Sequence, residues 1–181
     1  AQAIRIFREN GLARQRLEKE RDADWAIREL LARMTQRFQG CESFADVINV
    51  AELFAPNIAP GVSGRLYIVD RASWEMRCAA EWLSPEGEKK PFHPDACWAI
   101  RRGQSHPPVN GEPDIACSHL PASQMHQSLC VPLIAQGEAI GLLSFQNITP
   151  DTAPSRAYLE LMAEALGLAL ANQRLREALL E

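Results

Sequence analysis

Cysteine and histidine side chains gather in the middle of the chain. The sequence holds five cysteines and four histidines, and seven of these nine are His93, Cys97, His106, Cys117, His119, His126 and Cys130. Thiolate and imidazole are the ligands that Zn²⁺ and other thiophilic metals prefer, four of them at about 2.0–2.3 Å from the ion. We select Cys97, His106, Cys117 and His119 as candidate ligands of zinc or iron.

The spacing of these four residues permits convergence but does not demand it. Cys117 and His119 lie two residues apart, so in an extended strand both side chains would point to the same face. Cys97 near a helix start and His106 after a turn would then meet them across a cavity. The pattern is not that of a standard zinc finger. The alternative is that Cys97 and Cys117 are small buried hydrophobic residues and the histidines ordinary polar ones. We interpret the other cysteines and histidines of the chain as structural residues, with Cys130 packing within a strand: Cys41, Cys78, His93, His126 and Cys130.

Three residues beside Cys97 form a candidate site for an unknown small-molecule ligand. Trp98 could wall a cavity, and the guanidinium groups of Arg101 and Arg102 could bind a carboxylate or phosphate. Two adjacent arginines at a helix end more often neutralise its carbonyl terminus and lie in solvent. Both interpretations stay open at this point.

Helical and strand periodicities alternate along the chain in an order typical of α/β sensor domains. Apolar residues at steps of three and four predict a long helix over the first forty residues and a second helix after Ser43. Two-residue alternation predicts strands at 63–70, 76–82, 127–135 and 138–146, paired as two hairpins. Between the hairpins we expect a short helix at 95–102, and after them a long helix that begins at Ser155. The fold class is therefore α+β, with long helices at both ends.

The last helix carries a second apolar stripe besides the one that would cover a sheet. Its members recur at alternating steps of four and three residues: Leu161, Ala165, Leu168, Asn172, Leu175 and Leu179. This heptad seam predicts a homodimer through the terminal helices, with Asn172 as the polar residue that sets the register. The alternative is a helix buried on two sides within one subunit.

Composition excludes several other classes of protein. The chain has 181 residues, of which 46% are hydrophobic and 23% charged, as in ordinary globular domains. A net charge of −4 argues against nucleic acid or an anionic membrane as partner. No apolar run approaches the roughly 20 residues of a membrane span. The odd number of irregularly spaced cysteines favours a reducing compartment, and we expect a cytoplasmic protein.

The second hairpin carries a family resemblance. Residues 129–143 read L-C-V-P-L-I-A-Q-G-E-A-I-G-L-L, which resembles the final hairpin of GAF domains, where a V-P-L strand precedes a turn and a G-x-L strand. The resemblance extends over about residues 41–175. It implies a central antiparallel sheet flanked by helices, with a ligand cavity under loops on the opposite face. Residues 1–40 would then form a signalling helix that dimerises, and residues 176–181 the start of a linker.

A narrower resemblance concerns the segment rich in cysteine and histidine. Residues 94–106 read P-D-A-C-W-A-I-R-R-G-Q-S-H, and residues 116–120 read A-C-S-H-L. Both are similar to GAF domains that precede diguanylate cyclase (GGDEF) domains, and residues 170–176 resemble the helical linker to such cyclases. The resemblance implies a sensor, not itself an enzyme, that controls a diguanylate cyclase and hence cyclic di-GMP signalling. The C-terminal output domain is not within the sequence.

An enzymatic alternative rests on another group with the same fold. Free methionine-R-sulfoxide reductases carry cysteines in G-V-C-G and H-I-A-C-D stretches, at places comparable with Cys97 and Cys117 here. In that interpretation one thiolate attacks the sulfoxide and a second thiol resolves the product as a disulfide. Ala96, Trp98 and Ser118 depart from the reductase pattern, which disfavours this activity.

Overall fold

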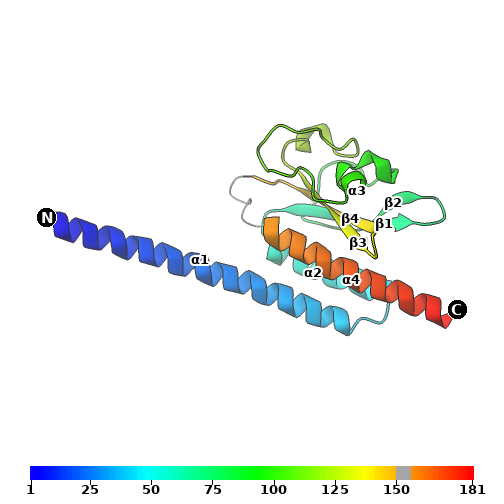
Figure 1. Cartoon of the computed structure of the whole chain (residues 1–181), viewed down its shortest axis with the longest axis horizontal. Helices are drawn as coiled ribbons and strands as arrows, with labels where there is room; N and C mark the ends of the chain where they lie inside the picture. Colours follow the sequence, from blue (N-terminus) through cyan, green and yellow to red (C-terminus); the bar gives the residue numbers. More distant parts are fainter. Residues whose placement is uncertain (150–155) are drawn as a thin grey trace.

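A four-stranded antiparallel sheet divides the protein into a helical layer and a layer of loops (Figure 1). The structure is a computed structural model that describes residues 1–149 and 156–181. The strands are β1 (Ser63–Asp70), β2 (Glu75–Trp82), β3 (Leu129–Ala135) and β4 (Glu138–Gln146), in the order β2-β1-β4-β3. Both predicted hairpins are present, and the α+β class with flanking helices is confirmed.

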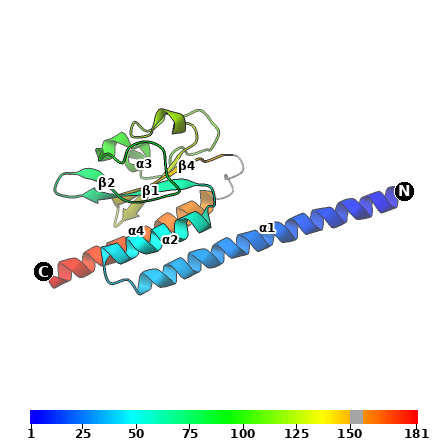
Figure 2. The ribbon, with the colours of Figure 1, turned by 180° about the vertical axis from the view of Figure 1, so that it is seen from behind.

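Three helices cover one face of the sheet: α1 (Gln2–Gln39), α2 (Phe44–Ile58) and α4 (Arg156–Leu180). Helix α2 begins where the sequence predicts, because the Ser43 hydroxyl accepts a hydrogen bond of 3.2 Å from the Asp46 amide. The predicted first residue of the last helix, Ser155, lies outside the described residues. In both views, α2 and α4 lie between the sheet and α1, and the N-terminal part of α1 extends well beyond the domain (Figure 2).

The opposite face carries the loops that connect the two hairpins. They contain helix α3 (Trp98–Arg102) and the 3₁₀ turns η1 (Pro94–Ala96) and η2 (Ala122–Gln124). The short helix predicted over 95–102 is present in part, as α3 preceded by η1. The two are separated at Cys97, whose backbone is extended at φ −116° and ψ 120°. This break matters because it separates the Cys97 side chain from the helical turns on either side.

Strand alternation builds a separate apolar core on each face of the sheet. On the helical side, Leu66, Val131 and Leu143 pack with Met162 and Leu166 of α4. On the loop side, residues from alternate strand positions pack with the loop cysteines: Tyr67, Val69, Cys130 and Leu142. Because successive strand residues point to opposite faces, Cys130 lies on the loop side although both its neighbours lie on the helical side.

The heptad seam on α4 faces solvent in the single subunit. Leu161, Leu168 and Leu175 are 47%, 63% and 51% exposed, and Leu179 is 85% exposed. The other stripe is buried in the helical-side core, as expected for the face that covers a sheet: Leu159, Met162, Ala163, Leu166 and Leu170. The seam is thus not a second buried side of the monomer.

Within residues 1–149 and 156–181, none of the helices combines the length and the apolar character that crossing a bilayer requires.

Candidate metal centre

Three cysteines and one histidine from three chain segments converge on the loop side of the sheet. Cys97 lies between η1 and α3, Cys117 and His119 lie in the loop before η2, and Cys130 lies on β3. We call these four residues the Cys/His cluster. Their ligand atoms, three Sγ atoms and one imidazole nitrogen, all lie within 4.8 Å of one another.

Two distances within the cluster are close to those of a tetrahedral site. The Sγ atoms of Cys97 and Cys117 are 3.9 Å apart, and Cys130 Sγ is 3.6 Å from Nε2 of His119. With Zn–S bonds of about 2.3 Å and Zn–N bonds of about 2.0–2.1 Å, a tetrahedron separates two sulfurs by about 3.8 Å and sulfur from nitrogen by about 3.6 Å. The donor set therefore has the composition of a Cys₃His zinc site, and these two pairs have its spacing.

The cluster is shielded from water, and neighbouring groups orient its ligands. Cys97 is fully buried and Cys117 and Cys130 are 1% exposed. The Trp98 amide donates a hydrogen bond of 3.3 Å to Cys117 Sγ, which stabilises negative charge on that sulfur. The Phe92 ring stacks on the His119 ring with centroids 4.3 Å apart, which holds the imidazole plane in place.

The three sulfurs titrate together because they share hydrogen bonds. Hydrogen bonds from Cys130 and Cys97 hold the pKa of the Cys117 thiol well below its usual value. The bond to Cys117 raises the pKa of Cys97 to about 12, and the pKa of Cys130 is also raised by its bond to Cys117. A bound cation would compete with these hydrogen bonds, because all three sulfurs would serve as its ligands in the deprotonated form.

His106 is the predicted ligand that the structure does not bring to the cluster. Its Nε2 lies 2.6 Å from the Ile115 carbonyl oxygen, and its Nδ1 lies 3.3 Å from a guanidinium nitrogen of Arg102. Its backbone pairs with that of Cys130 through two hydrogen bonds of 2.9 Å. His106 therefore stands beside the strand that supplies the fourth ligand, and Cys130 replaces it in the set.

Cys117 and His119 do converge, although no strand holds them. Residues 118–119 form a turn, and the Leu120 amide donates a hydrogen bond of 3.2 Å to the Cys117 carbonyl. The turn, and not strand alternation, brings both side chains to one point.

The three residues predicted to bind a small molecule lie next to the cluster without facing a common space. The guanidinium carbon of Arg101 lies 4.1 Å from the centroid of the Trp98 ring, a cation–π contact. Arg102 donates to the Ser105 carbonyl at 3.5 Å and lies near His106. None of the three lines the cavity that adjoins Cys117.

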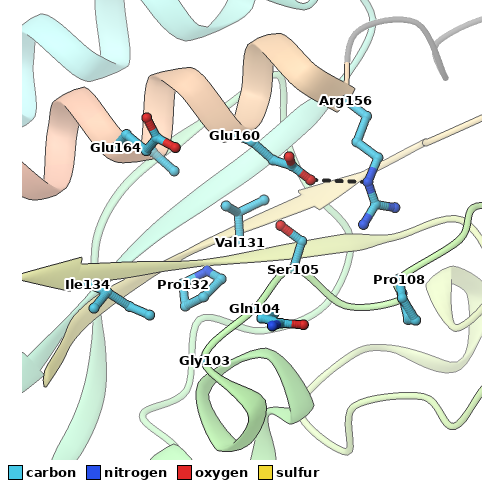
Figure 3. A pocket seen from close by; sticks show the side chains of 11 residues that line it. Gly103, Gln104, Ser105, Pro108, Val131, Pro132, Ile134, Arg156, Glu160 and Glu164 are labelled. Atoms are coloured by element: carbon cyan, nitrogen blue, oxygen red, sulfur yellow. Dashed lines mark hydrogen bonds and ion pairs between the residues drawn. The ribbon is translucent and has the colours of Figure 1, made fainter. Parts of the chain in front are cut away.

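One cavity, of about 240 Å³, adjoins the cluster and is lined by Cys117 together with His106, Ile115, Leu120 and His126, among others. Another, of about 420 Å³, has no cluster residue on its wall and lies at the outer edge of β3 beside α4 (Figure 3). Figure 3 shows Glu160 and Glu164 of α4 on its upper wall, with Glu160 paired to Arg156 at 3.2 Å.

The two remaining cysteines lie apart from the cluster. Cys41 belongs to the helical-side core, and Cys78 is half-buried on β2. All five cysteines are free thiols.

Comparison with solved structures finds the same architecture in sensory and enzymatic proteins. The GAF domain of a phosphoenolpyruvate-protein phosphotransferase from Coxiella burnetii is 18% identical, with a TM-score of 0.64 over 85% of this chain and 98% of that one. The GAF domain of the potassium sensor histidine kinase from Escherichia coli is 17% identical, with a TM-score of 0.58 over 84% and 98%. Free methionine-R-sulfoxide reductase from Neisseria meningitidis is 20% identical, with a TM-score of 0.61 over 83% and 91%. At these identities the likeness concerns the fold alone.

Sequence comparison agrees with the fold. No curated protein sequence matches this chain significantly. The sequence pattern of the GAF domain matches residues 39–173, close to the 41–175 that the hairpin motif indicates. With the sheet, the flanking helices and this match over most of its length, the chain belongs to the GAF domain family.

Proposed function

We propose that this GAF domain is a zinc-dependent regulatory sensor that controls a diguanylate cyclase through its terminal helices. The observation that carries the proposal is the convergence of the ligand atoms of Cys97, Cys117, His119 and Cys130 within 4.8 Å of one another. Four protein ligands leave no open position, which is the arrangement of structural zinc sites. Iron is the second candidate metal, because a sulfur-rich tetrahedral set also suits it.

The proposed metal would join segments that are otherwise held together by packing and a few hydrogen bonds. Its ligands come from the junction of η1 and α3, from the loop before η2 and from β3. Helix α4 lies directly on β3, since a Cβ atom at Gly167 would be 3.6 Å from the Ile134 carbonyl oxygen. A change at Cys130 therefore acts on the strand that α4 covers.

The signal would leave the domain through a helix pair. The exposed seam on α4 would form a homodimer, and metal binding would favour one arrangement of the paired helices over another. Metal can shift this equilibrium only by the difference between its affinities for the two arrangements. The likeness of residues 94–106 and 116–120 to GAF domains that precede GGDEF domains supports a cyclase as output. The free cysteines support a location in the reducing cytoplasm.

Elemental analysis of freshly purified protein tests the proposal directly. We expect one zinc ion per chain, lost in Cys130→Ser because an alcohol is a poor substitute for the fourth thiolate. The matched controls are Cys78→Ser, on the same face of the sheet but outside the cluster, and His106→Gln, which removes the ligand that sequence alone suggested. Both should retain the metal, with folding verified by circular dichroism. Zinc loss in His106→Gln but not in Cys130→Ser would contradict the assigned ligand set.

A methionine sulfoxide reductase activity is a second candidate function. The observation that favours it is the distance of 3.9 Å between Cys97 Sγ and Cys117 Sγ, with a cavity beside Cys117. A reductase would turn over free methionine sulfoxide many times per chain with a thiol reductant. Absence of such turnover in zinc-free, reduced protein would exclude it. A small molecule bound near Trp98, Arg101 and Arg102 would instead raise the melting temperature without dependence on metal or thiols.

A further inference from the structure

The cavity of about 240 Å³ adjoins one member of the Cys/His cluster. Among the described residues that line it, Cys117 is the one that belongs to the cluster, whereas Cys97, His119 and Cys130 are absent from its wall. A water molecule occupies about 30 Å³ in the liquid, so the cavity has room for a small polar molecule. His106, Asp114, His126 and Ser128 give its wall hydrogen-bonding groups.

A second thiol lies close to that of Cys117. Cys97 Sγ is 3.9 Å from Cys117 Sγ, whereas a disulfide bond needs about 2.0 Å. Neither cysteine lies within a helix or strand, because Cys97 separates η1 from α3 and residues 113–117 are irregular. Cys130, by contrast, is held on β3 by backbone hydrogen bonds to β4 and to His106. Approach of the first two sulfurs therefore disturbs no regular element.

We propose that Cys117 is the site at which a hydroperoxide oxidises this domain, with Cys97 as the resolving thiol. The Cys117 thiolate attacks the terminal oxygen of the hydroperoxide, so that an S–O bond forms, the O–O bond breaks and the alkoxide leaves as an alcohol after protonation. The Cys97 thiol then attacks the Cys117 sulfur, an S–S bond forms, and the departing hydroxide takes the Cys97 proton and leaves as water. The two sulfurs lose two electrons in total, and one hydroperoxide gains them.

Oxidation in this way would remove two of the four ligands of the proposed metal. His119 and Cys130 alone form an incomplete site, so the ion would leave the cluster. This consequence rests on the proposed zinc site, whereas the disulfide itself depends only on the two sulfurs and the cavity. The loop side of the sheet would thereby respond to peroxide as well as to metal.

The experiment treats zinc-loaded protein with hydrogen peroxide and follows two quantities. A chromogenic chelator measures released zinc, and peptide mass spectrometry without reduction maps disulfides. We expect one zinc ion released and one Cys97–Cys117 disulfide formed per chain, both reversed by a thiol reductant and added zinc. The double variant Cys41→Ser/Cys78→Ser should behave like the unaltered protein, because neither residue belongs to the cluster.

Two further measurements separate this inference from the proposed function. Metal-free protein should form the same disulfide, so the oxidation is tested even if no zinc binds. In Cys97→Ser, a dione reagent should trap a sulfenic acid on Cys117. A disulfide that involves Cys130, a Cys117 that stays reduced while Cys78 oxidises, or zinc retained in fully oxidised protein would each overturn the inference. Protein that takes up no zinc would overturn the metal site instead.

Discussion

At the scale of single residues, steric crowding explains why position 141 of the second hairpin is a glycine. A Cβ atom at Gly141 would lie 2.6 Å from the carbonyl oxygen of Tyr67 and 3.0 Å from the Leu133 side chain. Gly141 sits on β4 between β1 and β3, so strands on both sides approach it closely. The first residue of the G-x-L strand is glycine because the sheet leaves no room there for a side chain.

We expect Gly141→Ala to lower the free energy of unfolding by about 1–3 kcal/mol, because the β1 backbone has to move to admit a methyl group. The matched control is Gly11→Ala on α1, where an added Cβ meets nothing within 4 Å and helix propensity favours alanine by up to about 1 kcal/mol. Urea denaturation followed by circular dichroism compares the two variants. A Gly141→Ala protein as stable as the unaltered one would contradict the steric account.

At the same scale, Cys130 is a candidate metal ligand that the sequence analysis assigned to strand packing instead. The alternation of Leu129, Val131 and Leu133 with Cys130 and Pro132 is visible in the sequence, and it places Cys130 on the opposite face from the leucines. The loops that carry the other cysteines lie on that same face. This alternation would therefore have placed Cys130 among the candidate metal ligands. His106 looked equally suitable because nothing local reveals that its ring is engaged with Ile115 and Arg102.

At the scale of elements, α4 presents one face to the sheet and the other to solvent. Leu166 and Leu170 are almost fully buried, whereas Leu168 and Leu175 are 63% and 51% exposed. The exposed leucines follow the heptad spacing of a coiled coil. Pairing of two copies along this face would bury them.

We expect Leu168→Glu to raise the dimer dissociation constant at least about tenfold, since burial of one leucine contributes roughly 1.5–3 kcal/mol and the seam would lose it in both copies. Leu53→Glu serves as the control, because Leu53 is 67% exposed on α2 and lies outside the seam. Analytical ultracentrifugation measures the dimer dissociation constant of both variants and of the unaltered protein. A monomer at all concentrations in the unaltered protein, or equal effects of the two variants, would argue against the seam.

At the scale of the whole molecule, the sheet separates two cores that depend on different interactions. The helical-side core consists of aliphatic and aromatic side chains from the sheet and all three long helices. The loop-side core is smaller and includes three cluster cysteines. Loss of a metal would therefore loosen the loop-side core first and would reach the helical side through β3.

We expect chelation to leave the helix content unchanged while hydrogen exchange rises in residues 93–128. Bound metal at a thousand times its dissociation constant stabilises the folded state by about 4 kcal/mol, so the melting temperature should fall on removal. Hydrogen exchange followed by mass spectrometry measures the change in residues 93–128, with α2 as the internal reference. Uniform exchange over the whole chain would indicate that the metal holds the entire fold.

The sequence by itself determined the elements, the faces of the strands and the family. Periodicity and turn residues act over a few positions, as at Gln136 and Gly137, whose φ angles of 54° and 78° form the tight turn of the second hairpin. Only the tertiary structure decided which donors meet, because Cys97 and Cys130 are 33 positions apart and their distance depends on how the loop layer packs on the sheet. The distance between two such side chains is set by how distant segments pack against each other, and a local sequence pattern does not contain this information.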